Sequence, residues 1–225
     1  MSFRLGVVLL NTRFPRLAGD IGNPESFPFP VVYRRVEAAT VASVVREGAV
    51  AEEAAQALIS AAKGLAEDDG VSLIATSCGF LGAMQERLQE AVPVPVIASA
   101  FALLPFLRQV YGEAATIGVL TFDARRLSAA HFGPWSDAGT LVEGIEGGRE
   151  LYRVIAGDLP TLDREAAETE VCAAGKRLSA QAPELAAILL ECTNLSPYRR
   201  ALAEATGRPV YDLNQAIGWI AAGSA

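Results

Sequence analysis

Two short stretches, Thr76–Phe80 (TSCGF) and Glu191–Leu195 (ECTNL), decide the fold expected for this chain. Each follows an apolar run of the kind that forms a buried strand, residues 71–75 (VSLIA) and 185–190 (LAAILL). Each precedes a segment with helical spacing of apolar residues. Each half of the chain therefore carries one cysteine at the carboxyl end of a strand, where open α/β sheets hold their ligands. A helix N-terminus at that point favours a thiolate and an anionic ligand.

Strand-like and helix-like segments alternate along the whole sequence, and this order predicts a parallel sheet. The strongest strand candidates are nearly continuous apolar runs, as in central parallel strands: 4–10, 71–75, 115–120 and 185–190. We expect an α/β fold of two doubly wound parallel-sheet lobes, related by pseudo-symmetry, with the active site between them. The first lobe is placed at residues 1–97 and the second at 98–208, and the segment 209–225 is expected to complete the first lobe.

Several helices are predicted from apolar spacing and from residues that favour helix ends, among them the following three. The first covers residues 81–91, after the first cysteine turn. The second covers 124–132, with Thr121 or Asp123 as its cap. The third covers 161–180, with the threonine at its start as the N-cap.

Composition limits the classes of function. The 225 residues are 51% hydrophobic and 20% charged, which suits one or two compact domains with a real core. The net charge of -7 gives no basic face, so no nucleic-acid partner is expected. No apolar run approaches the roughly 18 residues of a membrane span, and the apolar N-terminus is predicted as a strand instead of a signal peptide. Three cysteines make no disulfide framework. We therefore expect a cytoplasmic protein with free thiols and no membrane partner.

The two cysteine turns and the alternating elements resemble the aspartate/glutamate racemase superfamily. That superfamily includes amino-acid racemases, hydantoin racemase, arylmalonate decarboxylase, maleate isomerase and the algal-type dimethylsulfoniopropionate lyases. The second turn is similar to the Gly-Cys-Thr turn of the family, with Glu191 where glycine is common. The first turn departs from the Cys-Asn-Thr pattern of the amino-acid racemases, because Gly79 and Phe80 follow its cysteine.

The resemblance implies cofactor-independent proton transfer at the carbon next to the carboxylate of a small amino acid or related acid. One thiolate, from Cys78 or Cys192, would remove the proton, and the other thiol would return one on the opposite face. Hydrogen-bond donors must meet the carboxylate, where charge grows. The predicted substrate-binding residues lie in the strand-end turns and in the long loop 11–30: Ser77, Gly79, Thr121, Thr193, Asn194, Asp20 and Asn23. No metal site is predicted, since Cys-x-x-Cys spacing is absent and the chain has one histidine.

Other chemically capable residues have simpler interpretations. Cys172 lies inside a predicted helix and is expected to be inert. His131 is expected to be a surface or core histidine. Arg13 and Arg16 are more consistent with solvated loop charges than with a substrate contact. Glu191 adjoins the second thiol and would raise its pKa.

Three functions remain open from the sequence. The first is a two-cysteine racemase or epimerase, an isomerase acting on a small carboxylate. The second is a lyase that takes the proton α to the carboxylate and expels a β leaving group, as the dimethylsulfoniopropionate lyases imply; covalent isomerisation of a double bond is a related possibility. The third is a carboxylate-binding protein without catalysis, because a fold does not fix a function. The resemblance also implies a homo-oligomer.

Overall fold

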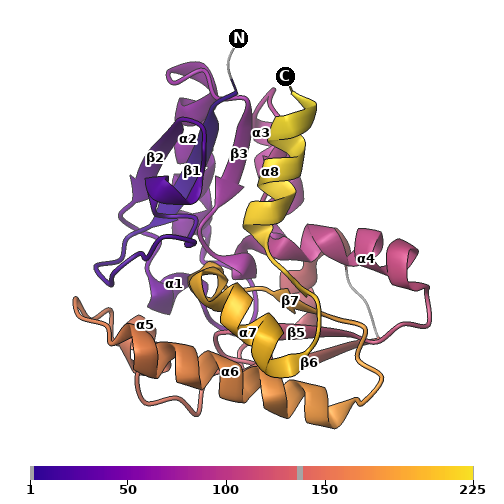
Figure 1. Ribbon diagram of the computed structural model, residues 1–225. Helices are drawn as coiled ribbons and strands as arrows, with labels where there is room; N and C mark the ends of the chain where they lie inside the picture. The colour runs from indigo at the N-terminus through magenta and orange to yellow at the C-terminus, as the bar shows by residue number, and fades with distance from the viewer. Residues whose placement is uncertain (1–2, 136–138, 225) are drawn as a thin grey trace.

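The structure is a computed structural model that describes residues 3–135 and 139–224. Two parallel four-stranded sheets form its two lobes, the first above the second in Figure 1. Their strand orders are β2-β1-β3-β4 and β6-β5-β7-β8. The two orders match position by position, which confirms the predicted pair of doubly wound parallel lobes.

The first sheet contains β1 (Leu5–Leu10), β2 (Val31–Val36), β3 (Leu73–Thr76) and β4 (Val96–Ile97). All residues of β1 and β3 are buried, because both faces of a central parallel strand are covered. The two-residue β4 lies at the edge of the sheet. Pro95 precedes it, and a proline without an N–H group suits an edge position.

The second sheet contains β5 (Ile117–Thr121), β6 (Thr140–Gly144), β7 (Ala187–Leu190) and β8 (Val210–Tyr211). The strands β5 and β7 are buried along their whole length. The central strands of both sheets therefore end at equivalent points, and each cysteine turn begins there.

Helices cover both sheets. The α-helices are α1 (Val41–Val44), α2 (Glu52–Glu67), α3 (Gln85–Ala91), α4 (Leu104–Tyr111), α5 (Leu151–Ala156), α6 (Arg164–Gln181), α7 (Arg199–Thr206) and α8 (Leu213–Gly223). The 3-10 helices are η1 (Pro24–Ser26), η2 (Gly79–Met84), η3 (Ala100–Leu103), η4 (Ala129–Trp135) and η5 (Thr193–Tyr198). Helices α2 and α6 are the longest, and each buries one face against its own sheet through small and branched apolar side chains.

Two helices cross between the lobes. The chain leaves the first sheet at β4, yet η3 and α4 pack against β5 and β7 of the second sheet. It leaves the second sheet at β8, yet α8 lies beside the first sheet (Figure 1). Of the segment 209–225 that we expected in the first lobe, β8 thus extends the second sheet and α8 returns to the first. One hydrophobic cluster joins side chains of both sheets and both crossing helices: Leu5, Leu73, Ile97, Phe101, Leu104, Val119, Leu189, Leu213 and Ile217.

The predicted helix over 124–132 is wrong. Tight turns follow β5, and only the 3-10 helix η4 forms. Asp123 does not cap a regular helix, because its buried carboxylate is bound by the side chains of Arg125 and Tyr152.

The other two predicted helices exist with different starts. The helix expected over 81–91 begins with the 3-10 turns of η2 and becomes α-helical only at Gln85. In α6 the N-cap is Asp163 and not Thr161, since the Asp163 carboxylate accepts the N–H groups of Glu165 and Ala166.

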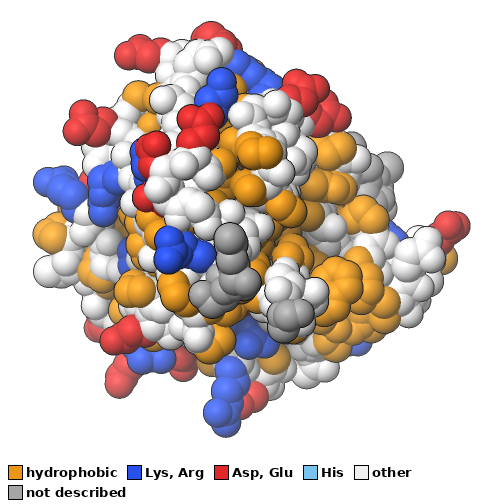
Figure 2. All heavy atoms as spheres, turned by 90° about the horizontal axis from the view of Figure 1, so that it is seen from above, with side chains coloured by type: hydrophobic (Ala, Val, Ile, Leu, Met, Phe, Trp, Pro, Cys, Tyr) orange, Lys and Arg blue, Asp and Glu red, His pale blue; other side chains and the backbone are white. Residues whose placement is uncertain are grey.

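Three large apolar side chains are exposed in the described part of the chain, Phe106 and Val110 of α4 and Trp219 of α8. Phe106 and Trp219 stack with ring centroids 6.2 Å apart and line a groove of about 390 Å³ between the two helices. Figure 2, which looks down on the molecule, shows hydrophobic side chains gathered on the right-hand part of this face.

That the protein forms a homo-oligomer remains a prediction. Among the described residues no helix is long and apolar enough to cross a membrane, and all three cysteines are free.

The shared core predicts that both lobes unfold together. Replacing Ile217, a fully buried residue of α8, by alanine is expected to lower the free energy of unfolding by about 2–5 kcal/mol. Denaturant unfolding followed by circular dichroism should show one transition, and amide hydrogen exchange should accelerate in both sheets.

The matched control lies on the same helix. Trp219 is 75% exposed, so Trp219→Ala should change stability by less than about 0.5 kcal/mol. Two separate transitions in the Ile217→Ala variant, or unchanged exchange in the second sheet, would contradict a shared core.

Candidate active site

Cys78 and Cys192 line one pocket between the lobes. Each lies two residues after the end of a central strand, β3 or β7, and each is 8% exposed. The remaining lining residues come from both lobes: Leu10, Phe14, Arg16, Val41, Val45, Ser77, Gly79, Phe80, Phe122, Ile155, Glu191 and Asn194. The fold therefore brings together the two thiols that the sequence places 114 positions apart (192 minus 78).

The residues before the two cysteines occupy equivalent places. The N–H of Ser77 donates to the carbonyl of Val8 at 3.1 Å, and the N–H of Glu191 donates to the carbonyl of Leu120 at 2.9 Å. Thr193 crosses the boundary, since its hydroxyl donates to the Ser77 carbonyl at 3.0 Å. The two cysteine turns thus hold each other in position.

Glu191 and Gly79 fit together. A Cβ atom on Gly79 would overlap both the carboxylate and the carbonyl oxygen of Glu191. Gly79 and Glu191 are both departures from the family pattern, and the structure shows that they belong together. Gly79 has no side chain, and the carboxylate of Glu191, from the other lobe, fills the space that a side chain would take.

The Glu191 carboxylate is buried with little compensation. Its Oε2 accepts the hydroxyl of Thr121 at 2.6 Å, whereas Oε1 accepts no hydrogen bond from the described residues. Burial raises the pKa of this carboxyl to about 7, although the Thr121 hydroxyl and the N–H groups of Phe122 and Phe80 act to lower it. Glu191 is therefore poised between the charged and neutral forms near neutral pH.

Both thiols are held in the protonated form. Burial, followed by the charge of Glu191, raises the pKa of Cys78 to about 12. The same two causes raise the pKa of Cys192 well above its usual range. The N–H groups of Phe80 and Asn194 oppose the shifts without outweighing them. The N–H groups at the two helix starts thus favour the thiolate, as expected, but desolvation and the adjacent carboxylate outweigh them in this state of the protein.

Arg16 lies in the pocket wall. The sequence had favoured a solvated loop charge at this position, and that prediction is wrong. It is 12% exposed, and its Nη1 donates to both oxygens of Asp20 at 3.0 and 3.3 Å. Its guanidinium also lies over the ring of Phe14, 4.7 Å from the centroid, and its Nε has no partner among the described residues. The four-residue spacing of Arg16 and Asp20 is the sequence signal that could have revealed this pair.

Asp20 links the loop to the second cysteine turn. Its carboxylate accepts the side-chain N–H of Asn194 at 2.5 Å. The side-chain amide oxygen Oδ1 of Asn194 lies 3.7 Å from the sulfur of Cys192, and the thiol donates a hydrogen bond to it. Burial raises the pKa of Asp20 in spite of Arg16.

The seven predicted substrate-binding residues lie in different places relative to the pocket. Ser77, Gly79 and Asn194 line the pocket, and Thr121 and Asp20 support lining residues from behind. Thr193 is bonded to the other turn. Asn23 lies apart, because its side chain caps η1 and donates to the carbonyl of Arg16. The sequence did not reveal the apolar walls of the pocket, because these residues lie in loops and short helices that show no periodicity. They are Phe14, Val41, Val45, Phe122 and Ile155.

The remaining candidates lie outside the pocket lining. His131 is buried, with its ring 4.7 Å from that of Phe80, and burial lowers its pKa. Cys172 is half-buried on α6. Within residues 3–135 and 139–224, no three His, Cys, Asp or Glu side chains cluster closely enough to hold a metal ion.

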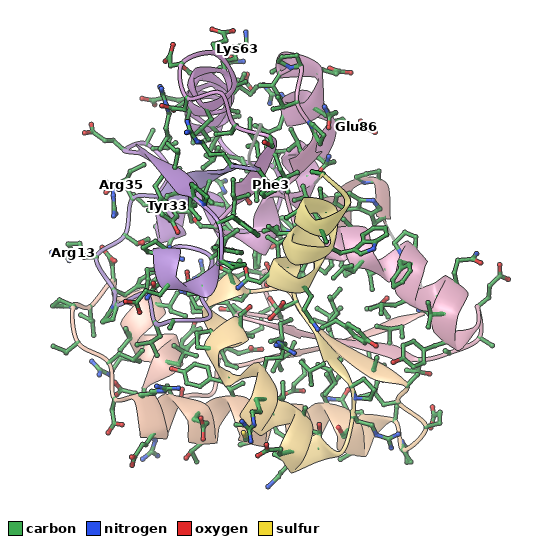
Figure 3. All side chains as sticks on the ribbon, turned by 45° about the horizontal axis from the view of Figure 1, so that its top comes forward. Phe3, Arg13, Tyr33, Arg35, Lys63 and Glu86 are labelled. Atoms are coloured by element: carbon green, nitrogen blue, oxygen red, sulfur yellow. The ribbon has the colours of Figure 1, made fainter. Side chains whose placement is uncertain are left out.

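The pocket is narrow and its walls are tied together. Its volume is about 20 Å³, little more than the room that one water needs. Arg13, at the edge of the molecule in Figure 3, donates its N–H and Nε to Asp158 at 2.5 and 3.1 Å. Arg126 donates to the carbonyl of Val45 at 3.0 Å. A substrate with several heavy atoms must therefore push these walls apart to enter.

Known proteins share this two-lobed fold. The family described as Asp/Glu/Hydantoin racemase matches residues 52–221. The chain resembles the solved structure of allantoin racemase from Klebsiella pneumoniae, with a TM-score of 0.65, 18% identity, and coverage of 99% of this chain and 87% of that one. It resembles unliganded arylmalonate decarboxylase with a TM-score of 0.62, 16% identity, and coverage of 98% and 92%. At these identities the likeness concerns the fold alone.

Curated relatives are more similar in sequence. A dimethylsulfoniopropionate lyase of Durusdinium sp. clade D is 32% identical over 215 residues, which is 92% of this chain and 70% of that protein. Dimethylsulfoniopropionate lyase 7 of Emiliania huxleyi (strain CCMP1516) is 29% identical over 222 residues, 92% of this chain and 63% of that protein. The chain thus spans between about three fifths and 70% of the length of these two relatives.

The close fit of Gly79 predicts a local stability effect. Gly79→Ala is expected to lower the free energy of unfolding by about 1–3 kcal/mol through overpacking against Glu191, as measured by denaturant titration. Gly218→Ala is the matched control, because open space surrounds Gly218 on α8, and it should be neutral or slightly stabilising. Equal stability of both variants would refute the close fit.

The charge of Glu191 predicts an effect on the thiols. Glu191→Gln removes the negative charge that raises both thiol pKa values, so thiolate absorbance near 240 nm should rise at a lower pH than in the wild type. A Cys172→Ala background leaves only the two pocket thiols in the titration. An unchanged titration curve would show that burial alone sets these pKa values.

Proposed function

The chain belongs to the Asp/Glu/hydantoin racemase family, and we propose that it is a cofactor-independent lyase that cleaves a β-sulfonium carboxylate such as dimethylsulfoniopropionate. The observation that carries this proposal is the similarity to proteins named dimethylsulfoniopropionate lyase over 92% of the chain. An uninterrupted match of that length spans both cysteine turns, wherever its ends fall. The two thiols in one pocket supply the chemistry.

The proposed reaction is a β-elimination. A thiolate, from Cys78 or Cys192, takes the proton from the carbon next to the carboxylate. The electron pair of that C–H bond forms the carbon–carbon double bond, and the carbon–sulfur bond breaks with its electron pair going to sulfur. The products are acrylate and dimethyl sulfide, and the proton stays on the cysteine until it passes to solvent. One base completes this reaction, whereas racemisation needs a second acid on the opposite face.

Arg16 is the proposed partner of the substrate carboxylate. It is the cation among the pocket-lining residues, and its Nε is unpartnered among the described residues. As the proton leaves, negative charge grows on the carboxylate, and a fixed guanidinium stabilises that charge without rearranging. The ion pair with Asp20 holds the guanidinium in place.

A racemase or epimerase acting on a small carboxylate is the second candidate. It is favoured by the arrangement of one thiol from each lobe around a single pocket, which suits a base and an acid on two faces of a substrate. The two functions differ in their products, so one experiment separates them.

The test is proton NMR in deuterium oxide with dimethylsulfoniopropionate and with single enantiomers of aspartate and glutamate. The lyase predicts vinyl signals of acrylate and release of dimethyl sulfide. Replacing the cysteine that acts as the base by alanine should reduce the rate of elimination at least about 100-fold. Of Cys78→Ala and Cys192→Ala, the variant with the smaller loss then identifies the thiol that is not the base. Treatment with EDTA should leave the rate unchanged.

Cys172→Ala is the control variant and should keep full activity, because Cys172 lies on α6 away from the pocket lining. Deuterium incorporation at Cα with both enantiomers appearing, and no acrylate, would overturn the lyase in favour of the racemase. Full activity in both the Cys78→Ala and Cys192→Ala variants would reject thiol chemistry altogether.

A further inference from the structure

Glu191 has no role in the proposed β-elimination, although it is among the most buried polar residues of the pocket. Its side chain is 1% exposed and lines the pocket beside both cysteines. Its Oε1 accepts no hydrogen bond from the described part of the chain. A buried carboxylate is strongly disfavoured unless a cation or several donors compensate it. The Thr121 hydroxyl and the N–H groups of Phe122 and Phe80 act on this carboxylate. No cation is paired with it among the described residues, so a cationic ligand would stabilise its charged form.

The pocket itself offers no free cation. Among the lining residues the positively charged one is Arg16, and its Nη1 is engaged by Asp20. The thiols beside Glu191 are those of Cys78 and Cys192, and neither can neutralise a carboxylate. The Arg16–Asp20 pair is neutral as a unit, so the pocket carries one uncompensated negative charge whenever Glu191 is ionised.

The walls around this charge are apolar and partly aromatic. Phe14, Phe80 and Phe122 line the pocket together with aliphatic side chains. A primary ammonium group needs several hydrogen-bond acceptors, and Oε1 of Glu191 is the buried side-chain oxygen of the pocket lining that has no partner among the described residues. A sulfonium or quaternary ammonium group carries its positive charge on methyl groups and needs none. Aromatic faces and a single carboxylate are the surroundings that such onium groups prefer.

We propose that Glu191 is the counter-ion for the onium group of the substrate, and that the pocket selects zwitterions with a sulfonium or quaternary ammonium at one end and a carboxylate at the other. This inference rests on the proposed lyase function, which supplies the sulfonium. It makes Glu191 a specificity-determining residue of the same site. Arg16 then meets the carboxylate end and Glu191 the cationic end.

The same contact couples binding to thiol ionisation. The Glu191 charge raises the pKa of both cysteines. A cation beside Glu191 offsets that charge, so the thiolate becomes accessible when the substrate is bound. The free protein thereby keeps its thiols protonated and unreactive.

The test compares two ligands of one shape at pH 8. The first, 3-(trimethylammonio)propionate, has the onium charge and a poor leaving group. The second, 4,4-dimethylpentanoate, has carbon in place of the charged nitrogen. Calorimetry on the wild type should show at least about tenfold tighter binding of the ammonium ligand, which is 1.4 kcal/mol. Glu191→Gln, which keeps the shape of the side chain, should reduce the preference to less than twofold.

Two outcomes overturn the proposal: no preference in the wild type, or a preference in Glu191→Gln as large as that of the wild type. In the second case, a lower turnover of Glu191→Gln would make Glu191 a base for the thiols. The wild-type comparison needs no variant to fold. Because neither ligand is cleaved, a clear preference without any release of dimethyl sulfide in the earlier test would refute the lyase while leaving the onium site in place. Cys172→Ala, which lies on α6 outside the pocket lining, is the control and should retain the preference.

Discussion

The carboxylate of Glu191, inserted from the second lobe against Gly79 of the first, is the contact on which the site depends. It fills the space that a side chain at position 79 would take, and it lies beside both thiols. Burial in that place is electrostatically unfavourable, as its raised pKa shows. The protein tolerates this because a large shared core surrounds the site, and functional sites are where such local conflicts are expected.

That core owes its rigidity to the crossing of α4 and α8. Each helix follows an edge strand of one sheet and packs near the other, so apolar side chains of both lobes belong to one cluster. The hydroxyl of Thr193 and the Arg13–Asp158 pair add polar links across the boundary. These contacts hold the two lobes together.

The charge pattern of the pocket unites the proposals. A neutral Arg16–Asp20 pair stands at one side and a single carboxylate at the other, with apolar walls between them. A zwitterion with an onium group matches this pattern if its carboxylate meets the Nε of Arg16, which has no partner among the described residues, and its cation meets Glu191. The thiols, which are protonated without such a ligand, ionise more readily beside it. Substrate binding and activation of the base are then one event.

The sequence by itself determined the parallel lobes and the two cysteine turns, because buried strands are apolar on both faces and a strand end followed by small residues is a local signal. It also placed Ser77, Gly79 and Asn194 near the thiols. Tertiary structure alone decided that α8 returns to the first lobe, that 124–132 is not helical, and that Arg16 faces the pocket. It likewise decided that desolvation by both lobes outweighs the backbone N–H groups at each thiol. These outcomes depend on contacts between residues far apart in the chain, which local pattern and propensity do not encode.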